Sequence, residues 1–145
     1  MARPTWVEMA MRVAETVAER STCSSRAPVG AVLLDKSHRI IGTGYNGAPP
    51  GEPHCDEEGH ILRDGHCIRA VHAEANAYYF SVGETEGSIL VVTHFPCLAC
   101  ANLIVSKGTR LVIYREAYRI DDAVVQMFRR RGIVLEQLQR AIIAS

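Results

Sequence analysis

The sequence predicts an α/β fold of three layers, α/β/α, with a mixed five-stranded sheet between helices. Two apolar runs, 29–34 and 39–44, are separated by Asp35-Lys36-Ser37-His38, a pattern typical of an antiparallel hairpin. From residue 88 onward, apolar runs of strand length alternate with helical segments, which favours parallel pairing. An antiparallel portion followed by a parallel portion gives the mixed sheet.

Local signals place the helices. Thr5-Trp6-Val7-Glu8 is a capping box, and apolar residues recur at helical spacing from Val7 to about Arg20. Asp121 and Asp122 begin a later helix, which Gly132 ends. The predicted order is helix 6–20, strands 29–34 and 39–44, helix 71–82, strand 88–93, helix 97–107, strand 110–114, helix 121–131 and an edge strand 133–138.

The stretch from Tyr45 to about Ala70 shows no periodicity, although it holds several prolines, glycines, histidines and cysteines. A loop of this length inside a compact domain is uncommon unless it is functional or held in place. We therefore expect some interaction to anchor it.

The composition limits the function classes. The 145 residues predict one domain, 1–145, with 48% apolar residues and zero formal net charge. Zero net charge argues against a groove that binds nucleic acid regardless of sequence, and Arg129-Arg130-Arg131 is interpreted as a solvated helix end. No apolar run approaches the roughly 20 residues of a membrane span, and Met1–Pro4 lacks the apolar core of a signal peptide. We expect a cytoplasmic protein with reduced cysteines, which favours metal chemistry over disulfides.

His72-Ala73-Glu74 and Pro96-Cys97-Leu98-Ala99-Cys100 carry the chemistry. One histidine and two cysteines are three ligands for a tetrahedral zinc, with the fourth position left for water. A helix N-terminus near each half of the motif favours thiolate. The pattern H-x-E…P-C-x-x-C is the signature of the zinc nucleobase deaminases.

In this interpretation His72, Cys97 and Cys100 hold the catalytic zinc, and Glu74 transfers protons. Zinc makes hydroxide available at neutral pH, for attack at C4 of a cytosine or C6 of a purine. Taken alone, Pro-Cys-x-x-Cys would equally indicate a redox pair or half of a structural zinc site.

The chain resembles the deoxycytidylate (dCMP) deaminases of bacteria and phages from about Trp6 to Leu138. The motifs that carry the resemblance are Val29-Gly30-Ala31-Val32, Gly44-Tyr45-Asn46-Gly47, His72-Ala73-Glu74-Ala75-Asn76-Ala77, Val92-Thr93 and Pro96-Cys97-Leu98-Ala99-Cys100. The resemblance implies a cytidine deaminase-like fold and zinc-dependent hydrolysis of dCMP to dUMP with release of ammonia. It also implies homo-oligomers, commonly hexamers, that dCTP activates and dTTP inhibits.

By the same resemblance five residues are candidates for substrate contact: Arg26, Asn46, Ala73, Phe95 and Tyr118. Asn46 would bind the sugar hydroxyl or phosphate, Arg26 the 5′-phosphate, and the N–H of Ala73 the base. Phe95 and Tyr118 would pack against the base. The alternatives are a turn at Asn46-Gly47, a surface arginine, and core or rim packing of the two aromatic residues.

Further cysteines and histidines are left over in the first half of the chain. Cys23, Cys55, His60 and Cys67 resemble the second, structural zinc site of some family members, with His66 in reserve. His54 is also left over. The alternative is buried free cysteines with histidines in solvent.

Other functions remain open at this point. The nearest is deamination of another small pyrimidine, such as cytidine, CMP or a 5-substituted dCMP. Deamination of a base within RNA or DNA is disfavoured by the zero net charge. A non-catalytic zinc-binding module is disfavoured by the presence of Glu74.

Overall fold

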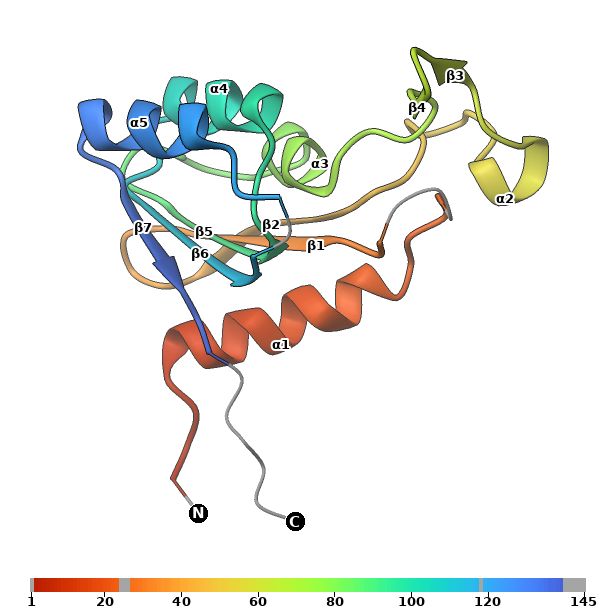
Figure 1. The fold of residues 1–145 in the computed structure, drawn as a ribbon. Coiled ribbons are helices and arrows are strands. Elements are labelled where there is room, and N and C mark those ends of the chain that lie inside the picture. The colour runs from red at the N-terminus through yellow and green to blue at the C-terminus, as the bar shows by residue number, and fades with distance from the viewer. Residues whose placement is uncertain (1, 24–26, 118, 140–145) are drawn as a thin grey trace.

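The computed structural model describes residues 2–23, 27–117 and 119–139. In it, a five-stranded sheet separates one long helix from three shorter ones (Figure 1). The strands of this sheet are β1 (Gly30–Leu34), β2 (Ile40–Tyr45), β5 (Ile89–His94), β6 (Leu111–Glu116) and β7 (Val134–Gln137). The helices that cover it are α1 (Trp6–Ala18) on one face and α3 (Ala73–Tyr79), α4 (Leu98–Ser106) and α5 (Asp122–Arg131) on the other.

The order of the strands across the sheet is β2-β1-β5-β6-β7. β1 runs antiparallel to both β2 and β5, whereas β6 and β7 run parallel to β5. The prediction of a three-layer fold around a mixed five-stranded sheet is confirmed. The edge position predicted for the last strand is confirmed as well.

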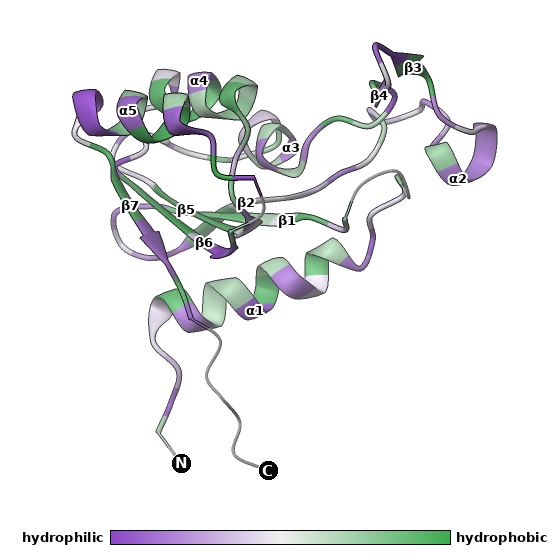
Figure 2. Cartoon of the chain, in the orientation of Figure 1, coloured by the Kyte–Doolittle hydropathy of each residue, from purple (hydrophilic) through white to green (hydrophobic). Residues whose placement is uncertain are grey.

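The strands at the centre of the sheet are buried on both faces. Alternate residues point to opposite sides, so that Leu33 and Leu90 face α3, α4 and α5 whereas Val32 and Val91 face α1. All four side chains are fully buried. In Figure 2 these strands are green, and the C-terminal end of α5, with its three arginines, is purple.

Helix ends follow the predicted signals where those signals lie next to the helix. Thr5 and Glu8 form the capping box of α1, Asp121 caps α5, and Gly132 ends α5 in the left-handed conformation. The predicted helix 71–82 is too long: α3 begins only at Ala73 and ends at Tyr79. It starts later because Val71 forms a bridge with Gly47 and therefore stays extended.

The stretch without periodicity contains short elements of its own. These are α2 (Cys55–Glu58), β3 (Leu62–Arg63) and β4 (His66–Cys67). The last two pair as a small hairpin, and the whole segment extends beyond one end of the large sheet (Figure 1).

Helix α3 lies directly against β2 because the strand carries glycines where the two meet. A Cβ atom on Gly44 would overlap the carbonyl oxygen of Ala73, in the first turn of α3. The backbone contact therefore sets the height of the α3 N-terminus above the sheet.

We predict that Gly44→Ala destabilises the protein by about 2–3 kcal/mol, because overpacking forces helix and strand apart. Thr43→Ala is the control, since Thr43 is the exposed neighbour on the same strand, and should cost under about 1 kcal/mol. Urea unfolding of both variants measures the difference. Equal free energies of unfolding would contradict the close contact.

Candidate metal centre

Three side chains from separate parts of the sequence converge at the carboxyl end of β5. The His72 Nδ1 atom lies 3.5 Å from the Cys97 Sγ and 3.4 Å from the Cys100 Sγ. Bond lengths of a tetrahedral zinc site place a nitrogen and a sulfur ligand about 3.5 Å apart. The three ligand atoms lie within 4.8 Å of one another, so this donor set fits a single zinc ion.

The backbone explains how these residues converge. His72 and Cys97 are not within their helices, as the sequence pattern suggested, but are the residues that cap α3 and α4. Both caps have extended backbone dihedrals, which turn their side chains across the end of the helix. Glu74 and Cys100, in contrast, lie in the first turns of α3 and α4. This difference allows His72 and Glu74, only two residues apart, to face the same point.

The two cysteines of this centre differ in pKa. The hydrogen bond from the Cys100 thiol lowers the pKa of Cys97 most, against the opposing effect of burial. His72 and the backbone N–H of Cys100 lower it further, to about 3. The pKa of Cys100 is raised, by its hydrogen bond with Cys97 and by burial. The lowered pKa favours the thiolate form of Cys97, and thiolate is the form of cysteine that binds metals.

Glu74 is a buried carboxyl group beside this centre, only 5% exposed. Burial raises its pKa, whereas its own backbone N–H, His72 and the Cys100 thiol act in the opposite direction. A buried carboxyl group with a raised pKa next to metal ligands is suited to accept and return protons.

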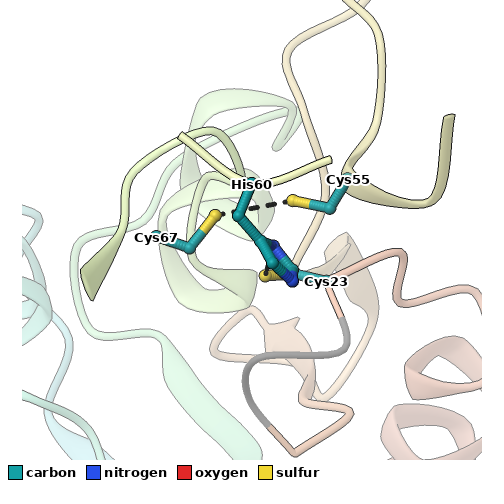
Figure 3. Close-up of side chains that lie close together, drawn as sticks. All are labelled: Cys23, Cys55, His60 and Cys67. Atoms are coloured by element: carbon teal, nitrogen blue, oxygen red, sulfur yellow. Dashed lines mark hydrogen bonds between the residues drawn. The ribbon is translucent and has the colours of Figure 1, made fainter. Parts of the chain in front are cut away.

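A second cluster joins Cys23, which follows α1, to Cys55, His60 and Cys67 of the segment that extends beyond the sheet (Figure 3). The sulfurs of Cys55 and Cys67 are 3.5 Å apart, and the Cys23 Sγ is 3.7 Å from the His60 Nδ1. The four ligand atoms lie within 4.8 Å of one another. Because three of these residues are buried cysteines, the set has the composition of a closed structural zinc site.

The cysteines of the second cluster also differ in pKa. Burial raises the pKa of Cys55 to about 12, with help from hydrogen bonds to Cys67 and Cys23. Burial also acts to raise that of Cys67, but hydrogen bonds from Arg69, Cys55 and Ile61 outweigh it and lower the pKa to about 6. Cys67 is thus the first of the pair to ionise. His66, the reserve ligand, is exposed and is not part of the cluster.

Asn46 comes directly after β2 and is 3% exposed. Its Oδ1 accepts a hydrogen bond from the Val29 N–H at 2.9 Å, which fixes the orientation of the amide. Its Nδ2 is buried and has no hydrogen-bond partner among the described residues. Such a donor is costly unless a ligand satisfies it. The next residue, Gly47, pairs with Val71, so Asn46 is held close to His72.

The other predicted substrate residues differ in their surroundings. Ala73 is buried and is the first residue of α3, so its N–H has no partner within the helix. Phe95 is 8% exposed and packs edge-to-face against Tyr114, with ring centroids 5.1 Å apart. Phe95 is therefore part of the core, and its contact with the substrate stays a prediction. Arg26 and Tyr118 lie outside the described residues.

Sequence reasoning missed contacts that join the loops around Asn46. The His54 Nδ1 is 2.9 Å from the Thr22 Oγ1 and accepts from the Ala48 N–H at 3.1 Å. The Asn76 Nδ2 donates to the Tyr45 carbonyl at 2.8 Å, which ties α3 to the end of β2. No local pattern signals these contacts, because each depends on the path of a loop.

A buried glutamate beside one histidine and two cysteines, at the end of a three-layer α/β/α fold, defines a zinc-dependent hydrolytic deaminase. Residues 4–116 match the cytidine and deoxycytidylate deaminase zinc-binding region. The chain belongs to this family.

The chain is also similar to individual proteins over most of its length. The chain is 41% identical over 127 residues to the deoxycytidylate deaminase of Mycobacterium phage D29, an alignment that covers 79% of this chain and 97% of the phage protein. It is 37% identical over 143 residues to ComE operon protein 2 of Bacillus subtilis, with 96% and 74% covered.

A solved structure agrees with the fold. The dCMP deaminase of cyanophage S-TIM5, in complex with dCMP and dUMP, has a TM-score of 0.79 and 32% sequence identity. The match covers 95% of this chain and 100% of the cyanophage chain. Within the described part of the chain, no helix has the length and apolar character needed to cross a membrane.

We predict that the purified protein contains two zinc ions per chain, and that Cys67→Ala contains one, because it opens the second cluster while leaving the first intact. His66→Ala is the control and should keep both ions, since His66 is exposed and outside the cluster. Atomic absorption on the three proteins gives the numbers. A wild-type content of one zinc would contradict the second site.

Proposed function

We propose that the protein hydrolyses dCMP to dUMP and ammonia, with His72, Cys97 and Cys100 as ligands of the catalytic zinc. The observation that carries the proposal is the position of Glu74, a buried carboxyl group in contact with the thiol of Cys100. A structural zinc site has no need of an ionisable, buried carboxyl group beside it, whereas deamination requires one. The names of the D29 and S-TIM5 proteins support dCMP as the substrate.

The reaction adds water to C4 of the cytosine ring and expels the amino group as ammonia. A bound zinc ion supplies Lewis-acid activation of water at neutral pH. Glu74 accepts a proton from the water and delivers it to N3 of the ring. It then accepts the second proton, from the hydroxyl now on C4, and delivers it to the departing amine, so that ammonia leaves and C4 becomes the carbonyl of dUMP. Burial suits Glu74 to this exchange, because a raised pKa makes its protonated form easier to reach.

The buried amide of Asn46 is the substrate contact that the geometry favours most. Its Nδ2 can donate to a hydroxyl or phosphate oxygen of the nucleotide. The nucleotide would then supply the hydrogen-bond acceptor that this buried N–H group otherwise lacks among the described residues. The N–H of Ala73, at the N-terminus of α3, is suited to bind the carbonyl of the base. We keep Arg26, Phe95 and Tyr118 as proposed contacts to phosphate and base by family resemblance.

The substrate is tested by measuring ammonia release from dCMP, CMP, cytidine, a 5-substituted dCMP and a single-stranded oligodeoxynucleotide. We expect dCMP to have the highest kcat/KM. Preference for another small pyrimidine would reassign the substrate within the family. Release only from the oligonucleotide would contradict the proposal, and no release from any compound would favour a non-catalytic zinc module.

We predict that Glu74→Gln lowers kcat by about 10³-fold, because a positioned acid–base group contributes about 10² to 10⁴ in rate. The zinc content should remain that of the wild type, since Glu74 is not a ligand. Glu84→Gln, at an exposed glutamate after α3, is the matched control and should keep full activity. Near wild-type turnover by the Glu74 variant would refute its role.

We predict that Asn46→Asp raises KM for dCMP by at least about tenfold, because one lost hydrogen bond and an added negative charge both weaken nucleotide binding. The aspartate retains the oxygen that accepts from the Val29 N–H, so that the local fold is kept. Steady-state kinetics measure the effect. An unchanged KM would mean that Asn46 serves only the turn.

We further propose that the protein is a cytoplasmic homo-oligomer, commonly a hexamer in the resembling family, and that dCTP activates and dTTP inhibits it. More than half-exposed apolar side chains at the end of α3, Tyr79, Phe80 and Val82, support assembly because they offer surface that a subunit contact would bury. The reduced thiols that both clusters require support the cytoplasm.

A further inference from the structure

His54 makes contacts that neither cluster explains. It is half-buried at the start of α2, and its Nδ1 atom faces both the hydroxyl of Thr22 and the backbone N–H of Ala48. It belongs to neither metal cluster. Its ring also packs on the turn after β2, where its Cε1 lies 3.5 Å from the place a Cβ on Gly47 would take.

The hydrogen-bond partners determine the role of the Nδ1 atom. A backbone N–H can only donate, so Nδ1 accepts from Ala48. The hydroxyl of Thr22 can then only donate to the same atom. Nδ1 is therefore an acceptor that joins two loops.

These two loops meet again at Asn46. The backbone carbonyl of Asn46 accepts from the Thr22 N–H at 3.3 Å, and from the hydroxyl of Ser21 at 3.4 Å. Ala48 lies two residues after Asn46. His54 thus links Thr22, which is hydrogen-bonded to the backbone of Asn46, to Ala48, which lies two residues after Asn46 in the sequence.

We propose that His54 is a positioning residue, which holds the turn 46–48 and through it orients the Asn46 amide toward the nucleotide. The inference rests on the proposed function, because it assumes that Asn46 contacts the substrate. Its neighbours strengthen the arrangement: Cys55 follows His54 and Cys23 follows Thr22, so that the second cluster holds both partners in place.

The test compares two amides at position 54 with a side chain that has no acceptor. In His54→Asn the Oδ1 takes the place of Nδ1, whereas in His54→Gln the amide reaches to the place of Nε2. We expect His54→Leu and His54→Gln to raise KM for dCMP about tenfold, since both lose the hydrogen bonds, with kcat within about twofold. His54→Asn should restore KM to within about threefold of the wild type.

Thr22 provides an independent pair of variants. Thr22→Val removes the hydroxyl that donates to His54 and should raise KM by about threefold to fivefold, because the Ala48 contact remains. Thr22→Ser should behave as the wild type. His38→Asn is the control: it removes an imidazole from the opposite end of β2 and should leave both constants unchanged.

Zinc content is measured on every variant. Three results would each overturn the positioning role. They are an unchanged KM in His54→Leu, equal KM values for His54→Asn and His54→Gln, and a rise in KM that occurs only together with loss of zinc. A wild type that releases no ammonia from dCMP would overturn the proposed function together with this inference. An active wild type that is indifferent to position 54 would overturn this inference alone.

Discussion

The structure depends on one constraint, which is that an imidazole nitrogen and two sulfurs must reach a single point. Two helix N-termini meet this requirement together. His72 and Cys97 cap α3 and α4, and α4 connects the neighbouring parallel strands β5 and β6. On the other side, Gly44 lets α3 lie directly on β2. The sheet therefore serves as a rigid base, and the helix ends that it positions carry the chemistry.

The second cluster shares no residue with the first, yet it lies next to the turn around Asn46. It joins the segment after α1, where Cys23 lies, to the two ends of the segment 55–67. Thr22 and His54 are the neighbours of its ligands Cys23 and Cys55. Their hydrogen bonds hold the turn around Asn46 in place. A metal ion in the cluster would therefore order a region of the chain that has few regular elements and little apolar core of its own.

Many features of the fold and of the metal centre could be predicted from the sequence, because they depend on residues that are close together along the chain. Caps such as Thr5 and Asp121, and the spacing of Cys97 and Cys100, involve neighbours along the chain, so pattern and structure agree. The first cluster could be predicted from its motif, and the second from the resemblance to the deoxycytidylate deaminases. The conformation of His72 as a cap could not be predicted, since a bridge between Gly47 and Val71 decides where α3 begins. The contacts of His54 depend on loop paths that leave no periodic signal.

The central claim is that a zinc ion held by residues 72, 97 and 100 is needed to deaminate dCMP. The most direct measurement removes the metal with a chelator, adds zinc back in steps, and follows dUMP formation together with bound zinc. We expect no activity in the stripped protein and recovery as zinc returns to the site, with the same recovery absent in Cys100→Ser. Conversion of dCMP by the stripped protein at the rate of the zinc-loaded one would contradict the account.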